Sequence, residues 1–478
     1  MTDKIAESPV PSSPSRLPTT WTTLPLDDPD WFVPVGVAAF TGRKLYFSTG
    51  SIQPSAKEPE GEFEFANRPT RANRMGRRWD VLQARMAGAN KAVIVDESLS
   101  DSLFSTGFMQ WRPPVAPETL GPWLFYAVQA PDFLALRDRL ASGTTQVALN
   151  DGNLSKITIP IAPMAEVHRI VEAIETRFAR LDAAIRALKR ARANLTRFRM
   201  SVLWAAVSGR LVPPQVPEQS RSRFGPSIQP DSFYPLDLGS LPRSWHVAYL
   251  NELADEVQSG FATGDHNSDG KGIPHLRMAN VTREGNLDLS RLEFVPHPKP
   301  TRIRKGEILF TNTNSFELVG KTALFDKDGE WAISNHMTRI HLRQGLEPAF
   351  FARHLHYLWM AGYFRHRCTR HVNQASFGIE ALNTSVPLVV PAVTEQRQIV
   401  EAIEVRLSVI DQVSKEVRQW FDRCHRLRES ILKMAYEGRL VPQDPNDEPV
   451  SALHQRIKHL CQTTPAPPRR TRKERASG

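Results

Sequence analysis

Cysteine and long apolar runs are scarce in this sequence. Their scarcity argues against a disulfide-linked protein, a cysteine zinc protein and a membrane-spanning protein. The 478 residues include only Cys368, Cys424 and Cys461, and no two of them form a C-x-x-C pair. Neither a disulfide framework nor a cysteine zinc site is therefore indicated, and a reducing compartment fits. No run approaches the roughly 18 apolar residues of a membrane span, and the N-terminus lacks the apolar segment of a signal peptide. We expect a cytoplasmic protein without membrane contact.

Recognisable catalytic motifs are also absent. The stretch "LVGKT" at Leu318–Thr322 ends like a phosphate-binding loop, but Ser315 stands where the first glycine is required. We find no N-P-P-Y or D-P-P-Y sequence of a methyltransferase, no glycine-rich cofactor loop and no nuclease arrangement of acids with lysine. We predict no catalytic residues and no cofactor in this chain. An enzyme with an unrecognised site remains an alternative, and it would require activity from the isolated chain.

The net charge favours a polyanionic partner. Lysine and arginine number 61 against 51 acidic residues, which gives +10 at pH 7 and a pI near 9.6. The run "FRHRCTRH" brings His366, Cys368 and His371 close together in sequence, but this spacing matches no standard zinc pattern. We predict no metal site and interpret the run as a basic surface that contacts phosphate.

The strongest pattern is a long internal repeat. "IVEAIE" occurs at Ile170–Glu175 and again at Ile399–Glu404, and the similarity continues to "GRLVP", which ends at Pro213 and Pro442. The two copies are 229 residues apart throughout, without a gap, and share about 18 of 44 positions. A period of this size indicates a duplicated half of the protein rather than a solenoid of short repeats.

Each copy reads as one long helix. Neither contains proline or glycine before Gly209 and Gly438, which we predict to follow the helix ends. The apolar residues recur at alternating steps of three and four, which is typical of a coiled coil. The predicted seam consists of Phe178, Leu181, Ile185, Leu188, Leu195 and Val202 in the first copy and Leu407, Ile410, Val417, Phe421, Cys424 and Ile431 in the second.

The simplest partner for one seam is the other. The alternative is two unrelated amphipathic helices that each pack on their own domain, and the constant offset argues against it. Arg192, Arg199 and Arg428 interrupt the seam, and we expect them to extend into solvent or to meet acids such as Glu416.

Weaker similarities precede both helices. "LPTTW" at Leu17–Trp21 matches "LPRSW" at Leu241–Trp245, and "RRWDVLQ" matches "RKGEILF". Apolar alternation predicts strands, and two longer segments predict helices. The strands are expected at Lys44–Ser48, Lys91–Val95, Glu307–Thr311 and Thr338–Leu342, and the helices at Pro131–Ala141 and Pro348–Phe364.

The predicted order is domain, helix, domain, helix, with proline-rich or basic connections. The segments are a disordered N-terminus 1–16, domain one 17–158, the first helix 159–213, a linker 214–240, domain two 241–386, the second helix 387–442, and a short helix with a basic disordered tail 443–478. The predicted fold class is α+β, with two mixed domains separated by two long antiparallel coiled-coil helices and an internal pseudo-two-fold duplication.

Over about residues 17–455 the chain resembles the specificity subunits of type I restriction–modification enzymes. The resemblance lies in "LPRSW", "LRMANVTREGNLDLSRLEFV", "RKGEILFTNTNS", "LVGKTAL", "VPAVTEQRQIVEAIE" and "GRLVP". The first half diverges more: Glu166 matches Glu395, but Gln396 has no counterpart.

The resemblance implies a non-catalytic, DNA-binding subunit. Each domain would be a target-recognition domain that reads half of a split sequence in double-stranded DNA, and the helices would set the gap. Two methyltransferase subunits would dock on the chain, and restriction/translocase subunits would join through the complex. S-adenosylmethionine is then expected in the methyltransferase partner, and ATP and Mg in the restriction partner.

Candidate DNA contacts are arginine, asparagine and glutamine residues, because these side chains bind phosphates and base edges. For each, the alternative is a solvated surface charge or a turn asparagine. The candidates are Arg68, Arg71, Arg74, Arg77, Arg78 and Gln146 in domain one, and Arg277, Asn280, Asn312, Asn314, Asn335, Arg367, Arg370, Asn373 and Gln374 in domain two. A different class of function, a coiled-coil scaffold without DNA readout, predicts no DNA footprint.

Overall fold

The computed structural model describes residues 17–53, 56–143, 147–213, 228, 230–296 and 301–452. The predicted N-terminal segment 1–16, most of the linker and residues 453–478 of the predicted C-terminal helix and basic tail lie outside these residues. The chain forms two compact units. Unit 1 comprises Met1–Ala187 and Trp420–Gly478, and unit 2 comprises Leu188–Gln419. Each unit thus combines one mixed domain with part of both long helices, whereas the predicted segments treated the helices as separate parts.

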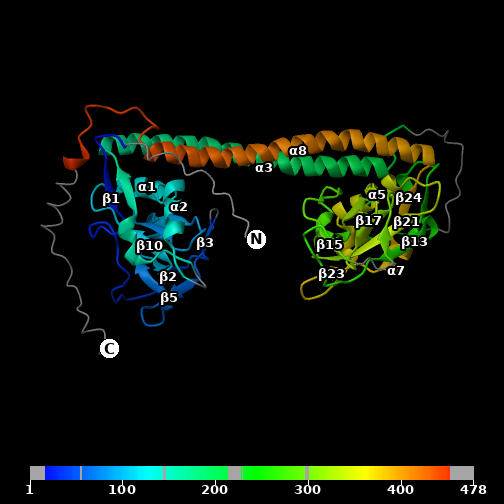
Figure 1. Ribbon diagram of the computed structural model, residues 1–478, viewed down its shortest axis with the longest axis horizontal. Helices are drawn as coiled ribbons and strands as arrows, with labels where there is room; N and C mark the ends of the chain where they lie inside the picture. The colour runs from blue at the N-terminus through cyan, green and yellow to red at the C-terminus, as the bar shows by residue number, and fades with distance from the viewer. Residues whose placement is uncertain are drawn as a thin grey trace. The chain divides into compact units, whose positions relative to one another are not determined.

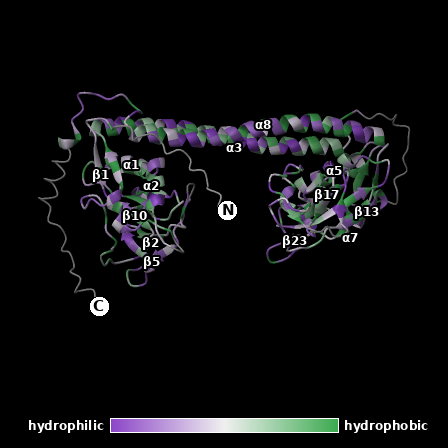
Figure 2. Cartoon of the chain, viewed as in Figure 1, coloured by the Kyte–Doolittle hydropathy of each residue, from purple (hydrophilic) through white to green (hydrophobic). Residues whose placement is uncertain are grey.

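Two helices of 44 residues dominate the chain: α3 (Met164–Val207) and α8 (Val393–Tyr436) (Figure 1). At 1.5 Å per residue each is about 66 Å long. Both end as predicted, because Gly209 and Gly438 follow with positive φ angles of 71° and 68°. Hydrophobic and hydrophilic residues alternate along both helices, as expected for amphipathic helices (Figure 2).

The helices pair antiparallel in both units. In unit 2, Arg199 of α3 forms an ion pair with Asp411 of α8. In unit 1, Arg428 of α8 pairs with Asp182 of α3 at 3.0 Å. Each residue of one pair lies 229 positions from its counterpart in the other. The two arginines thus meet acids across the helix pair, as expected, although the partners are aspartates and not Glu416.

Every predicted seam residue has a buried or half-buried side chain. The predicted break at Arg199 is also buried, because its guanidinium group contacts Asp411 and the backbone carbonyl of Glu284. Arg428 is half-buried and lies over the ring of Phe178, 4.1 Å from its centre. Both arginines combine an ion pair with packing, whereas Arg192 is exposed.

The domain of unit 1 is a set of small sheets with two covering helices. Strands β10 (Phe108–Trp111), β7 (Val81–Ala84) and β8 (Ala92–Ile94) form one antiparallel sheet. The remaining elements are β1 (Thr22–Pro25), β2 (Lys44–Phe47), β3 (Ile52–Gln53), β4 (Ala56–Lys57), β5 (Gly61–Phe63), β6 (Ala72–Met75), β9 (Leu103–Ser105), β11 (Thr158–Ile161), α1 (Pro117–Ala127), α2 (Pro131–Leu140) and the 3-10 turns η1 (Glu97–Leu99) and η2 (Asp151–Lys156).

The domain of unit 2 is built from the same kinds of elements. Its four-stranded antiparallel sheet has the order β13-β21-β17-β19, with β13 (Ala254–Ser259), β21 (Met337–Leu342), β17 (Ile308–Thr311) and β19 (Thr322–Leu324). The other elements are η3 (Leu238–Ser240), β12 (His246–Ala248), α4 (Leu250–Leu253), β14 (Ile273–Leu276), η4 (Met278–Asn280), β15 (Glu293–Val295), β16 (Arg302–Ile303), β18 (Thr313–Asn314), β20 (Trp331–Ile333), α5 (Pro348–Met360), α6 (Tyr363–Arg367), β22 (Thr369–Arg370), β23 (Ala375–Ser376), α7 (Ile379–Ser385) and β24 (Leu388–Val390).

The two domains share a strand topology. The order β5-β2-β9-β6 in unit 1 corresponds to β15-β14-β20-β16 in unit 2, and both sheets contain one parallel pair at the centre. The order β10-β7-β8 corresponds to β21-β17-β19, and the terminal pair β1-β11 corresponds to β12-β24. The matching stretches of sequence therefore reflect a duplicated domain.

The predicted strands and helices are confirmed, with one exception. The segment predicted as a single helix over Pro348–Phe364 consists of α5 and α6, because the backbone turns at Gly362 with φ of 84°. A left-handed glycine ends the first helix and allows the second to begin in another direction. The "RRWD" and "RKGE" stretches also match in structure, since Trp79 and Gly306 both have positive φ.

A buried carboxylate follows each of these positive-φ residues. Asp80 accepts hydrogen bonds from Arg112 Nε and Gln110 Nε2, both at 2.7 Å, and from the backbone N–H of Arg77 at 2.8 Å. Glu307, its counterpart in unit 2, accepts from Arg339 Nη1 at 2.8 Å and from the backbone N–H of Arg304 at 2.9 Å. Each carboxylate thus fixes the turn before a central strand.

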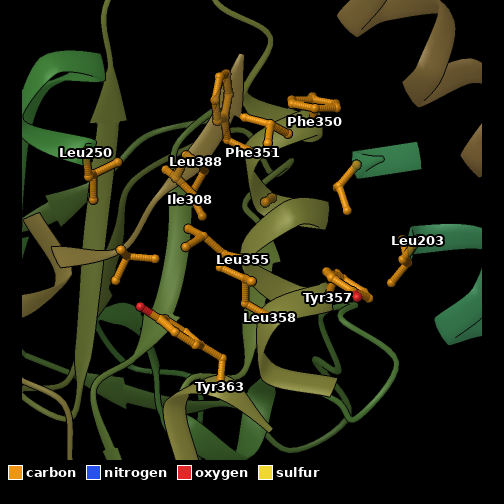
Figure 3. Close-up of a cluster of buried hydrophobic side chains, with 14 of the residues drawn as sticks. Leu203, Leu250, Ile308, Phe350, Phe351, Leu355, Tyr357, Leu358, Tyr363 and Leu388 are labelled. Atoms are coloured by element: carbon orange, nitrogen blue, oxygen red, sulfur yellow. The ribbon is translucent and has the colours of Figure 1, made fainter. Parts of the chain in front are cut away.

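Each domain packs on the ends of both helices through one continuous core. In unit 2 this core joins Val202, Leu203 and Ala206 of α3 to α5, to the central sheet and to Ile399 and Ile403 of α8. Figure 3 shows Leu203 opposite Tyr357 of α5, with Leu355 and Leu358 on the same helix. The apolar face of the helix pair is therefore part of the hydrophobic core of the domain.

Glycine is required where a helix end meets a domain. A Cβ atom on Gly209 would lie 2.4 Å from Pro242 Cγ, and one on Gly438 would lie 2.5 Å from Pro18 Cγ. In unit 1, Trp21 Nε1 also donates to Glu166 Oε2 at 2.9 Å. The repeated "GRLVP" and "LP-x-x-W" motifs are thus two sides of one contact, which occurs once in each unit.

We expect that replacing Asp80 by alanine destabilises the protein by about 3 kcal/mol, the lower end of the range for breaking a buried ion pair, because Arg112 retains partial solvent access. Glu97→Ala is the matched control, since Glu97 forms an exposed pair with Arg78 and its removal should cost less than about 1 kcal/mol. Urea unfolding measures both changes. Equal effects of the two substitutions would contradict the structural role of Asp80.

We also expect unit 2 to lose stability in mild acid. His354 of α5 is fully buried, neither of its ring nitrogens has a hydrogen-bond partner among the described residues, and burial lowers its pKa to about 3. The unfolded chain binds a proton near pH 6.5 and the folded chain does not. Stability therefore falls as the pH drops below 6.5, by about 2 kcal/mol at pH 5.

Unfolding measured between pH 7.5 and 5 tests this, with His354→Leu as the comparison. The variant should lose part of the pH dependence, while His356, whose pKa burial also lowers to about 3, retains its own share. A pH profile unchanged in the variant would show that His354 does not contribute.

Candidate nucleic-acid interface

The basic candidates of unit 1 lie on and around β6, and most of them are exposed. Arg71, Arg77 and Arg78 have exposed side chains. Arg78 pairs with Glu97 at 3.3 Å and lies over the ring of Trp79. Arg68 is half-buried, donates to the carbonyl of Ala72 at 3.1 Å and stacks on Phe65. Three arginines thus face solvent beside a loop that Arg68 holds in place. The candidate Gln146 lies outside the described residues.

Arg74 belongs to the interior instead. Its side chain is 1% exposed and donates to the carbonyl of Val33 at 2.8 Å, and burial lowers its pKa to about 10. A guanidinium group in this position holds the segment before β2 against β6. Alternation along β6 places Arg74 on the buried face together with Ala72, whereas Arg71, Arg77 and Arg78 lie outside the strand.

Three of the unit 2 candidates also have structural roles. Asn280 is buried and donates to the carbonyls of Asp288 and Arg291. Asn312 is buried and donates to Thr338 Oγ1 at 2.9 Å. Arg367 pairs with Asp231 at 2.9 Å and donates to the carbonyl of Ser385. The sequence could not reveal these structural roles, because asparagine and arginine side chains can either anchor loops or contact bases.

Three further candidates lie nearer the surface. Arg277 is exposed and pairs with Glu293. Asn314 is half-buried, and its side-chain oxygen accepts from the backbone N–H of Ser315 at 2.8 Å, as in a turn. Asn335 is exposed in the turn between β20 and β21. Arg277 and Asn335 contact the buried candidates, because the backbone N–H of Arg277 donates to Asn280 Oδ1 at 2.8 Å and Asn312 Nδ2 donates to the carbonyl of Asn335 at 3.2 Å.

The remaining candidates come together on one hairpin. Strands β22 and β23 form a hairpin whose turn is closed by a 2.7 Å bond from the backbone N–H of His371 to the carbonyl of Gln374. Arg370, His371, Asn373 and Gln374 are all exposed on this hairpin. Two donors suited to base edges therefore stand at its tip beside two basic side chains.

The hairpin also carries a residue that the sequence did not single out. Val372 is 100% exposed at the turn. The hairpin itself is anchored, because β23 pairs with β18 and Phe377 is buried in the core. Arg370 lies 3.7 Å from the centre of the Phe316 ring. An apolar side chain held in solvent on a fixed support is suited to contact with an apolar group of a ligand, such as a thymine methyl.

The stretches considered for other chemistry have structural explanations. Lys321 of the "LVGKT" stretch is buried and donates to the carbonyls of Met278 and Val281. His366 stacks on Phe233, and Cys368 Sγ contacts the carbonyl of Arg365. Within the described part of the chain, no three histidine, cysteine or acidic side chains form a group that could hold a metal ion. Among the same residues, no helix is long and apolar enough to cross a membrane.

The fold defines a class: a duplicated α+β protein whose two like domains are each built on paired antiparallel helices. No protein-family model matches the chain. The EcoKI specificity subunit of the type I restriction enzyme of Escherichia coli K12 is 27% identical over 379 residues, covering 76% of this chain and 75% of that subunit. The EcoBI specificity subunit of Escherichia coli is 25% identical over 333 residues, covering 67% of this chain and 66% of that one.

A comparison with solved structures finds the same architecture. A chain solved in work on complex assembly and conformational transition of the type I R-M system has a TM-score of 0.66 and 20% identity, covering 89% of this chain and 100% of that one. The chain is similar in sequence to specificity subunits of type I restriction–modification systems, and its fold matches that of the solved chain. The predicted resemblance and the predicted fold class are confirmed.

Proposed function

We propose that this chain reads a bipartite sequence in double-stranded DNA and recruits methyltransferase subunits to it. One observation carries the proposal: two domains of the same topology are each built on the same antiparallel helix contact, repeated at a 229-residue offset. Two equivalent reading domains suit two half-sites, as in other DNA-binding proteins whose half-sites lie about one turn (~34 Å) apart.

The surfaces of the two units support DNA as the ligand. Unit 1 exposes Arg71, Arg77 and Arg78, which suit phosphate contacts. Unit 2 exposes Asn373 and Gln374 at a hairpin tip, where an amide side chain can bond an adenine edge with two hydrogen bonds. We propose that this hairpin reads bases in the major groove and that Val372 contacts a thymine methyl.

The partner subunits belong to the proposal as well. Val405, Val409 and Val413 recur at every fourth residue of α8 and are exposed, so they form an apolar strip suited to a partner. We propose that two methyltransferase subunits, which would bind S-adenosylmethionine, dock on the chain. Restriction/translocase subunits, which would use ATP and Mg, would join through the complex in the cytoplasm.

A scaffold that assembles proteins without reading DNA is the second candidate. The exposed valines of α8 fit it equally well. The exposed amide and basic side chains of the β22–β23 hairpin favour DNA reading, because a scaffold has no need of base-reading groups on an anchored support.

Methylation mapping tests the proposal. Long-read sequencing of cells that express this chain with its cognate methyltransferase subunit should show a split methylated motif that cells lacking the chain do not have. Replacing residues 17–158 by those of a relative should change one half of the motif. If no motif is found although the methyltransferase works with another specificity subunit, the scaffold function is favoured.

The hairpin gives a residue-level prediction. Asn373→Ala should reduce discrimination at one base pair of one half-site by about 1–3 kcal/mol, or roughly 5- to 150-fold, because a bidentate base contact is lost. Binding to duplexes with single base changes measures this. Asn251→Ala is the control, since Asn251 is exposed on α4 of the same unit. Unchanged discrimination at every position would remove Asn373 from the reading surface.

A further inference from the structure

Unit 2 contains an arginine-rich cleft apart from the β22–β23 hairpin. The cleft has a volume of about 540 Å³ and is lined by residues of α3 and α8, of the α5–α6 turn and of the loop after η4. Five arginine residues line it that form no ion pair in the described part of the chain: Arg192, Arg197, Arg283, Arg365 and Arg418.

A sixth arginine is already neutralised. Arg199 also lines the cleft, but it is buried and paired with Asp411. Two carboxylates, Glu284 and Glu317, share the lining. The five remaining arginines outnumber them, so the cleft carries a surplus of three positive charges within a small volume.

Such a surplus favours an anionic ligand. Like charges gathered at one place repel one another, and a polyanion that binds there removes this repulsion and releases its own counterions. The carboxylates repel an anion, but five guanidinium groups from four parts of the fold can donate forked hydrogen bonds to phosphate oxygens. The chemistry of the cleft therefore matches a chain of phosphates better than a single small acid.

The position of Arg365 connects the cleft to the reading hairpin. Arg365 lies on α6, and only Cys368 separates the end of this helix from β22 of the hairpin. A duplex that contacts Asn373 can therefore continue along the same stretch of chain toward the cleft. This continuity favours DNA over an acidic surface of a partner protein.

We infer that this cleft binds the phosphate backbone of the DNA whose bases the hairpin reads, and so contributes affinity without sequence preference. The inference rests on the proposed function, since it needs DNA bound to unit 2. It gives the helix pair a direct role in DNA binding, because Arg192, Arg197 and Arg418 belong to α3 and α8.

The test uses the full chain in complex with its methyltransferase subunits. The triple variant Arg283→Gln, Arg365→Gln, Arg418→Gln is compared with wild type for binding to a cognate and an unrelated duplex between about 50 and 200 mM salt. Each lost phosphate contact should reduce the slope of log affinity against log salt by about 0.9. We expect a slope smaller by about two to three, weaker binding to both duplexes and unchanged sequence preference.

Arg406→Gln is the matched control, because Arg406 is exposed on α8 outside the cleft and bonds the carbonyl of Ala402. Unfolding midpoints verify the fold, and single variants at Arg283 and Arg418 replace the triple variant if it is unstable. A slope equal to wild type overturns the inference. Loss of the methyltransferase subunit with an unchanged slope also overturns it and assigns the cleft to that partner. Absence of DNA binding by wild type overturns the proposed function itself.

Discussion

The antiparallel contact between α3 and α8 is the constraint on which both units depend. A purely apolar seam leaves the register of two helices weakly determined, whereas a charged group that must find its partner permits few alignments. Arg199 with Asp411 and Arg428 with Asp182 supply this restriction, once in each unit. Because the apolar faces of the same helices form part of each domain's hydrophobic core, the register also determines where each domain packs on its own helix segments.

Contacts at the helix ends link the register of the helices to the position of each domain. Gly209 and Gly438 have no Cβ atom, so a proline side chain can pack directly against the backbone there. The end of each helix therefore contacts the start of a domain directly. In unit 1, Glu166 at the start of α3 adds a bond to Trp21, and burial raises the pKa of this carboxyl group. A short, glycine-dependent contact resists small rotations, which suits the proposed function, because binding surfaces must keep fixed positions on their supports.

The polar residues of the candidate interface form two groups: buried residues that anchor loops, and exposed residues that we propose to contact bases. Arg74, Asn280, Asn312 and Arg367 satisfy backbone carbonyls and side chains within the loops. Their buried bonds hold the loops, while Asn373 and Gln374 stay free in solvent. Polar residues of one chemical type thus occur both as supports and as candidate readers, and burial separates the two groups.

The sequence by itself determined the duplication, the helix ends, the resemblance to type I specificity subunits and four of the strands, because these depend on local pattern and on repeated motifs. The 229-residue offset even placed the two Arg–Asp pairs at equivalent positions, although it did not say that they meet. Only the tertiary structure decided which polar candidates are buried, that Val372 is fully exposed and that five arginines from separate segments line one cleft. The reason is that burial and convergence depend on how distant segments pack, and a linear pattern contains no distances between them.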